Sequence, residues 1–313
     1  MSPSLRIDRR TFNTALASTV AVSAGLPNLQ IAAAKEKAFK LKFIVASCMY
    51  GKAPLAKILP QVRAAGADYI EIWAKSHGNQ REQIDQLGVD KVRQLMVEHK
   101  VLLGSFTCFK YGIFRMQGEM ALVKRLGGDM VICNSGGPRG LKGDKLKDAI
   151  QAWARKLKPS VEKAEELGIT IGLENHSGSL INSPDTQKRV LDLLPSKNFG
   201  IALAPYHLPQ DAKGIGKLIQ HLGKRLVHFQ AWEHGMGCHK KLPKNQELMQ
   251  LPGRGKLDFT PIVASLKKIQ YSGRTEIFMH PVPRGIPILP KLDQVTAEIN
   301  RSRKYLSQCL ARD

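Results

Sequence analysis

Cysteine is scarce in this 313-residue sequence, and its five cysteines form no CxxC pair. Three of them, Cys48, Cys108 and Cys133, fall in apolar segments that we expect to be strands, where a free thiol acts as a small apolar filler. We therefore expect no disulfide framework. Long apolar runs are also missing, since the least polar stretch is cut by Ser, Thr, Gly and Pro before it reaches the roughly 20 residues that span a bilayer. The sequence predicts no transmembrane segment.

Acidic residues are few, with 26 Asp and Glu against 48 Lys and Arg, which gives a net charge of +22. Such a charge favours acidic partners such as nucleic acid, an anionic polysaccharide or a membrane surface, or it reflects only a solvated basic surface. The basic residues are spread along the chain and form no separate arm. We therefore do not expect a nucleic-acid partner despite the charge.

The usual nucleotide-binding motifs are also missing. No GxGxxG follows the first expected strand, and no GxxxxGK[ST] occurs. The nearest string, Gly253-Arg254-Gly255-Lys256-Leu257, has the wrong spacing for a phosphate loop. These absences argue against a dinucleotide-binding domain and against a P-loop enzyme.

The first 34 residues have the order of parts found in an export signal. Paired arginines stand before an aromatic residue in Asp8-Arg9-Arg10-Thr11-Phe12, a modestly apolar run covers 15–26, and Ala32-Ala33-Ala34 fits a small-residue cleavage site. This pattern predicts a twin-arginine-like signal peptide over 1–34, with residues 35–313 as the exported domain, periplasmic or extracellular. A disordered N-terminus or an uncleaved anchor are the alternatives.

From residue 41 onward, strand-like and helix-like segments alternate eight times. This pattern predicts an α/β fold, a (β/α)8 TIM barrel in a single domain. An open doubly wound sheet also alternates, but it usually has about five or six strands and needs a topological switch. The expected strands cover 41–47, 67–73, 101–109, 129–134, 169–174, 199–204, 225–230 and 274–279.

Polar side chains follow or end several of these strands, at the barrel face where chemistry occurs. Glu174 and Glu276 lie in otherwise apolar strands, and such a carboxylate is costly unless a cation or hydrogen bonds compensate it. With His228 they would form an oxygen and nitrogen cluster that suits Mn²⁺, Mg²⁺, Zn²⁺ or Co²⁺. Glu174 and Glu276 could instead be structural carboxylates, and Arg274, near Glu276 in the sequence, could pair with it. His228 could instead be a core histidine. Further polar or aromatic residues at these ends are Glu71, Trp73, His176, His207 and Gln230.

Several short motifs together resemble the xylose-isomerase-like barrels, which include sugar phosphate isomerases and epimerases, ketose 3-epimerases, hydroxypyruvate isomerases and inosose dehydratases. The resemblance rests on segments 66–72, 173–176 and 205–208 with His228 and Glu276. It implies that Glu174, His228 and Glu276 are metal ligands. The family's strand-six aspartate is replaced by Ala204, and the Lys-Asp that often follows the strand-seven histidine is absent. A weaker metal site, a rearranged site and a barrel without activity all remain open.

The resemblance also implies a function. Glu174 and Glu276 would move protons through an enediolate of a keto-sugar or related polyol, His207 would orient a hydroxyl, and the other strand-end residues would line the pocket: Glu71, Trp73, His176 and Gln230. The alternatives are a catalytically impaired carbohydrate-binding barrel, which Ala204 favours, and an endonuclease IV-like DNA repair nuclease. A homo-oligomer is compatible with the sequence.

Overall fold

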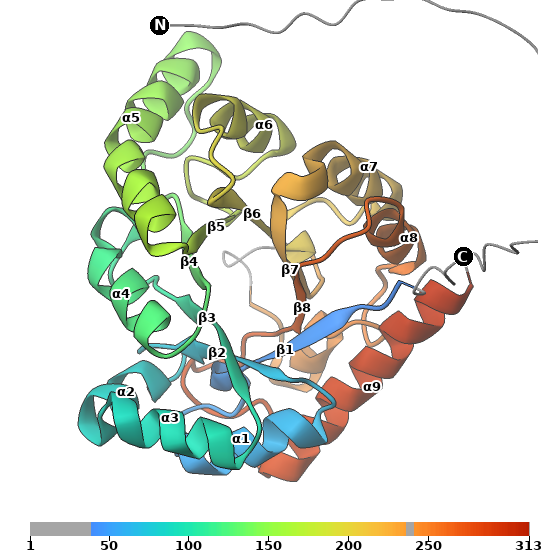
Figure 1. Ribbon diagram of the computed structural model, residues 1–313. Coiled ribbons are helices and arrows are strands. Elements are labelled where there is room, and N and C mark those ends of the chain that lie inside the picture. Colours follow the sequence, from blue (N-terminus) through green and yellow to red (C-terminus); the bar gives the residue numbers. More distant parts are fainter. Residues whose placement is uncertain (1–38, 236–240, 313) are drawn as a thin grey trace, which may run out of the picture. The chain divides into compact units, whose positions relative to one another are not determined.

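Eight parallel strands close into a barrel in the computed structural model, which describes residues 39–235 and 241–312 (Figure 1). Each strand pairs with the next one in the chain, and β1 pairs with β8 to complete the circle. The predicted (β/α)8 barrel is confirmed. The strands are β1 Lys42–Ala46, β2 Tyr69–Trp73, β3 Leu102–Thr107, β4 Met130–Asn134, β5 Thr170–Glu174, β6 Phe199–Leu203, β7 Leu226–Ala231 and β8 Arg274–Ile277.

Helices surround the barrel on its outside, as Figure 1 shows. The apolar side chains of each helix pack onto the strands, so the strands are buried on both faces and read as nearly continuous apolar runs. The α-helices are α1 Leu55–Ala64, α2 Gln80–Leu87, α3 Val89–Glu98, α4 Gln117–Arg125, α5 Gly143–Leu167, α6 Pro184–Leu193, α7 Ala212–Leu222, α8 Thr260–Lys268 and α9 Leu292–Ala311.

The structure differs from the expected elements in two places. The helical segment expected after β2 is two helices, because Gly88 adopts φ +80° between α2 and α3, a conformation that suits glycine and interrupts the helix. The long segment between β7 and α8 contains a 3-10 helix, η6 (Lys244–Gln250), in addition to the alternating elements. Both differences lie outside the strands, so the strand-end residues keep their expected places.

Arg274 in β8 is directed to a partner other than Glu276. Its guanidinium donates to both carboxylate oxygens of Asp129, at 2.7 and 2.6 Å, and lies 4.4 Å from the centre of the Tyr69 ring. The alternative that Arg274 neutralises Glu276 is therefore wrong, since the arginine is held by the residue just before β4. Another group must therefore compensate for the burial of the Glu276 carboxyl group.

Two further expectations concern disulfide bonds and membrane-spanning helices. Cys48, Cys108, Cys133 and Cys309 are buried free thiols, so the part of the chain that the structure describes has no disulfide among them. No helix within the described ranges is long and apolar enough to cross a membrane. The predicted signal peptide over 1–34 lies outside the described residues.

Candidate functional site

Two clusters of ionisable side chains lie at the strand ends. The first, here called the deep cluster, consists of Glu71 from β2, His228 from β7 and Glu276 from β8. One ligand atom from each lies within 4.8 Å of the other two, and all three residues have no exposed surface. His228 Nε2 is 3.2 Å from Glu276 Oε2.

The Glu71 carboxyl group is held by side chains on three sides. Trp73 Nε1 donates to its Oε2 at 2.8 Å, and Thr107 and Ser105 donate to its Oε1 at 2.7 and 3.2 Å. Burial, followed by the charge of Glu276, raises the pKa of Glu71 well above its usual range. Glu71 therefore holds its proton more tightly than an exposed glutamate does.

Burial also shifts the other two members of the deep cluster. It raises the pKa of Glu276 to about 7, although hydrogen bonds from Glu71 and Gln230 act in the opposite direction. It lowers the pKa of His228 to about 4, so this imidazole is neutral at pH 7. Burial thus favours the neutral form of each of the three groups, which lowers the free-energy cost of enclosing them in the barrel.

The second cluster, here called the rim cluster, consists of Glu174 from the end of β5, His176 two residues later and His207 from the 3-10 helix η3 (Pro205–His207). His207 Nε2 lies 3.1 Å from Glu174 Oε1. Burial acts to raise the pKa of Glu174, but the hydrogen bond from His207 and the two nearby imidazoles outweigh it, so the pKa lies below its usual value. Glu174 is a carboxylate at neutral pH.

Gln230 lies between the two clusters. Its side-chain amide is close enough to both Glu174 and Glu276 to lower the pKa of each, yet neither amide atom has a partner of good hydrogen-bond geometry among the described residues. Ala204, which replaces the family's aspartate, is fully buried and offers no ligand atom. Asn175 fixes it by accepting from the Ala204 backbone N–H at 2.7 Å and donating to its carbonyl at 3.2 Å.

The three metal ligands expected from the sequence therefore do not lie in one cluster. Glu276 and His228 share the deep cluster, whereas Glu174 belongs to the rim cluster. Each cluster combines carboxylate oxygens with imidazole nitrogens, a donor set that fits a divalent cation. The structure therefore contains residue groups that could hold a metal ion, and the assignment of ligands stays a prediction.

Aromatic side chains fill the space beside both clusters. Trp73 stacks on Phe278 with ring centres 5.1 Å apart, and Tyr206 stacks on Trp232 with centres 3.8 Å apart. Trp73 is only 1% exposed, so it anchors Glu71 and packs in the interior instead of offering a face to a ligand. The expected role of Trp73 as a pocket residue stays a prediction, and the burial of its side chain argues against it.

Two further imidazoles, those of His77 and His280, lie in this region and were not predicted as site residues. The rings of His77 and His280 are 4.7 Å apart and both contact Trp73. Burial, with the nearby Arg284 guanidinium acting in the same direction, lowers the pKa of His77 to about 3. His77 follows strand two by four residues, a position that could have marked it as a strand-end residue.

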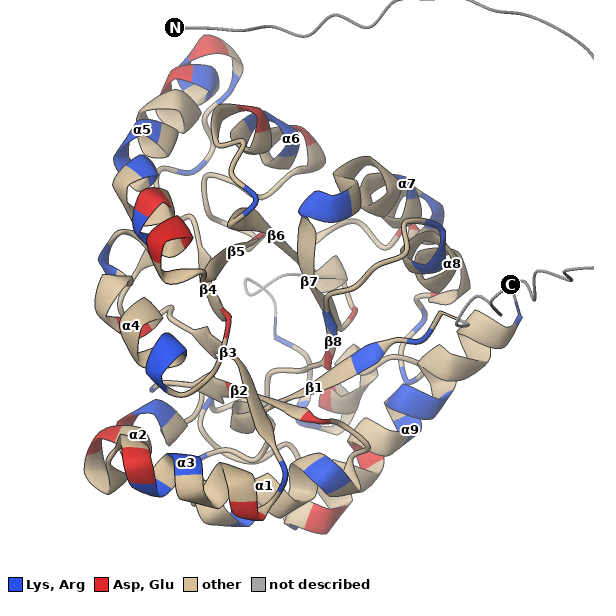
Figure 2. Ribbon diagram, viewed as in Figure 1, with Lys and Arg blue, Asp and Glu red and all other residues tan. Residues whose placement is uncertain are grey.

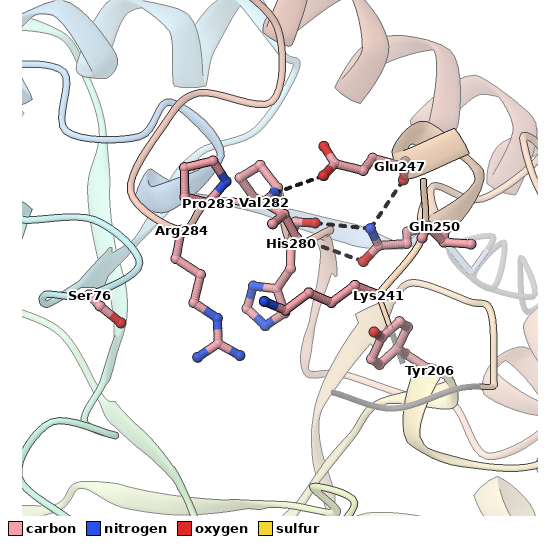
Figure 3. A pocket seen from close by; sticks show the side chains of 11 residues that line it. Ser76, Tyr206, Lys241, Glu247, Gln250, His280, Val282, Pro283 and Arg284 are labelled. Carbon is pink, nitrogen blue, oxygen red and sulfur yellow. Dashed lines mark hydrogen bonds between the residues drawn. The ribbon is translucent and has the colours of Figure 1, made fainter. Parts of the chain in front are cut away.

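Two cavities open beside these rings. One, of about 550 Å³, is bordered by Tyr206, His280, Arg284, Lys241 and Glu247, and Figure 3 shows these side chains approaching it from different segments. The other, of about 360 Å³, is lined by these residues: Lys75, Ser76, His77, Phe109, Lys110, Asn134, His176 and Arg284.

The lining of these cavities is strongly basic. The smaller cavity has no acidic residue in its lining, and the larger has only Glu247, which is paired with Lys244 at 2.7 Å. Within the described ranges, the side chains of Arg284 and Lys75 form no ion pair, whereas Lys110 is paired with Glu82. On α2, α5 and α9, by contrast, both basic and acidic residues occur (Figure 2). The mouth is therefore a place where an anionic group would be attracted.

Comparisons with known proteins agree with this architecture. A model of the family described as xylose isomerase-like TIM barrel matches residues 59–304. The chain belongs to this family of barrels. A comparison with curated proteins finds no match.

Solved structures with a similar fold share little sequence identity with this chain. An IolI protein with a bound zinc atom is 17% identical with a TM-score of 0.66, covering 87% of this chain and 99% of that one. An L-ribulose 3-epimerase is 16% identical with a TM-score of 0.65, covering 87% and 95%. A D-psicose 3-epimerase determined in the presence of D-fructose is 14% identical with a TM-score of 0.66, covering 86% and 99%. At these identities, the likeness establishes the fold.

Proposed function

We propose that this protein is an isomerase or epimerase that moves a proton next to the carbonyl of a keto-sugar, assisted by a divalent metal ion. The observation that carries the proposal is the placement of Glu174 and Glu276 on either side of Gln230 inside the barrel, each with its own imidazole. The sugar epimerases among the similar structures support the same reaction class.

The two carboxyl groups differ in a way that suits proton transfer. The pKa of Glu174 lies below its usual value and that of Glu276 is raised to about 7, so near neutral pH one is a base while the other can hold a proton. Glu174 would take the proton from the carbon beside the carbonyl, which forms an enediolate. Glu276 would return a proton, to the opposite face of that carbon for epimerisation or to the neighbouring carbon for isomerisation. A divalent ion at this mouth would polarise the carbonyl and acidify that C–H bond.

The basic mouth supports a finer choice of substrate. Arg284 borders both cavities, and a guanidinium without an acidic partner in the described residues suits a carboxylate or phosphate on the sugar. If the export predicted from residues 1–34 holds, an oxidised sugar with a carboxylate is the better candidate, because free phosphosugars are scarce outside the cytoplasm. We therefore propose an anionic keto-sugar as the preferred substrate.

The test is solvent exchange. Purified full-length protein, supplied in turn with Mn²⁺, Mg²⁺, Zn²⁺ or Co²⁺, is incubated in D₂O with D-psicose, D-tagatose or L-ribulose and with carboxylated ketoses. We expect deuterium beside the carbonyl and formation of the epimer, both lost in Glu174→Gln. Absence of exchange with every metal and substrate would leave the alternative, a carbohydrate-binding barrel without catalysis, which Ala204 favours.

A further inference from the structure

The rim cluster has the features of a metal site of its own. Glu174, His176 and His207 each place one ligand atom within 4.8 Å of the other two. Glu174 Oε1 and His207 Nε2 are 3.1 Å apart, and both side chains are almost fully buried, at 3% and 1% exposed. The three come from two neighbouring strand ends, β5 and β6, so the barrel itself fixes their spacing.

One residue, Ser177, orients both imidazoles. The Nδ1 of His176 lies 2.7 Å from the Ser177 carbonyl oxygen, which can only accept, so in the neutral ring Nδ1 carries the proton and Nε2 is the nitrogen suited to a metal ion. The Nδ1 of His207 lies 3.0 Å from Ser177 Oγ, and its Nε2 is the nitrogen that faces Glu174. Histidines that bind a metal usually donate their other ring nitrogen to such a partner, which fixes the tautomer and the ring.

The deep cluster lacks these features. His228 Nδ1 has no hydrogen-bond partner among the described residues. The ring is therefore not oriented by a hydrogen bond at the nitrogen opposite its contact with Glu276. The Glu71 carboxyl group is already occupied by Trp73, Thr107 and Ser105. Neither of the two cavities at the mouth is lined by a member of the deep cluster, whereas His176 lines the cavity of about 360 Å³. An ion and a substrate can therefore meet at the rim cluster.

We propose that Glu174, His176 and His207 bind one divalent transition-metal ion, in place of the set with His228 and Glu276 that the family resemblance implies. This inference rests on the proposed function and gives its metal a location. Two imidazoles and one carboxylate are a common ligand set for catalytic zinc, with the remaining positions open to oxygen atoms of water or substrate. Because nitrogen donors dominate, the site should prefer Zn²⁺ or Co²⁺ to Mg²⁺.

The experiment measures metal binding without activity. Full-length protein is stripped with a chelator, and Co²⁺ binding is followed by titration calorimetry and by the visible spectrum of the bound ion. We expect one equivalent to bind, with affinity lowered more than about 100-fold in His176→Gln and His207→Gln. Ser177→Ala, at a partly buried site where the fold should tolerate the change, should lower affinity about tenfold. His228→Asn should stay within about threefold of the wild type, as should the exposed control His221→Gln.

Anomalous diffraction from zinc-loaded crystals locates the ion even if a variant fails to fold. A peak among the three rim residues supports the proposal. A peak beside His228 and Glu276, wild-type affinity in Ser177→Ala and His176→Gln, or no bound metal would each overturn it. Wild-type solvent exchange separates this result from the proposed function. If solvent exchange occurs but the ion lies outside the rim cluster, the rim site is wrong and the proposed reaction stands. If the ion lies at the rim cluster but no exchange occurs, the proposed reaction is wrong and the metal site stands.

Discussion

Glu174 Oε1 lies 3.1 Å from His207 Nε2, a contact that joins the end of β5 to the segment that follows β6. His207 stands three residues after Ala204, the position where the family's aspartate is missing. The imidazole therefore gives Glu174 the partner that the alanine cannot. The loss of one carboxylate from strand six is compatible with a rearranged site and does not by itself imply an empty one.

Proton transfer should depend on Glu276 more than metal binding does. Glu276→Gln keeps the size of the side chain and removes the proton that the carboxyl group holds near pH 7. We expect solvent exchange to fall about 10²–10⁴-fold, while Co²⁺ affinity stays within a few-fold of the wild type. Parallel measurement of both quantities on one preparation is the check. Equal loss of metal and exchange would instead make Glu276 a ligand.

Asn175 should be important for stability, because it ties the end of β5 to Ala204. Asn175→Ala leaves a buried backbone N–H and a buried C=O without partners, so we expect the free energy of unfolding to fall by about 2–4 kcal/mol. Urea denaturation followed by circular dichroism measures this. The matched control is Asn300→Ala, where one exposed bond to the Ala64 carbonyl is lost and the change should stay below about 1 kcal/mol. A similar loss in both variants would contradict the assignment.

The stability of the fold should decrease in acid through His77. Its pKa is about 3 in the folded protein against about 6.5 when unfolded, so the unfolded chain binds more protons between these values. Stability is therefore lost as the pH falls from about 6.5 toward 3. In His77→Gln, the slope of unfolding free energy against pH should be smaller by up to about 1.4 kcal/mol per pH unit. Urea unfolding at pH 4.5, 5.5 and 6.5 tests this against His221→Gln, and an unchanged slope in His77→Gln would refute it.

Arg284 should discriminate between charged and neutral substrates. In Arg284→Gln we expect KM for a ketose with a terminal carboxylate, such as D-tagaturonate, to rise about tenfold or more with little change in kcat, because a charge-assisted hydrogen bond is lost. KM for neutral D-tagatose should hardly change. Steady-state kinetics with D-tagatose 6-phosphate as a third substrate shows whether carboxylate or phosphate is preferred. Equal effects on charged and neutral sugars would exclude an anion-binding role.

The barrel could be predicted from the sequence because each strand is a short apolar run closed by a turn, and the closure of eight parallel strands brings their ends to one face. That reasoning also placed Glu174 and Glu276 at a common mouth. It could not show that Gln230 lies between them. Nor could it show that Arg274 bonds Asp129, so that Glu276 contacts His228 instead. Such pairings depend on side-chain directions and strand register, which spacing along a single chain does not determine.

The stacked rings beside the site, Trp73 on Phe278 and Tyr206 on Trp232, have their faces covered by one another. These four rings are at most 6% exposed, so they offer a sugar little surface, and its recognition depends more on the loops that carry Lys75, Lys241 and Arg284. Loops tolerate substitution far better than a packed interior. We therefore expect a change of substrate in this protein's descendants to begin with new residues in those three segments.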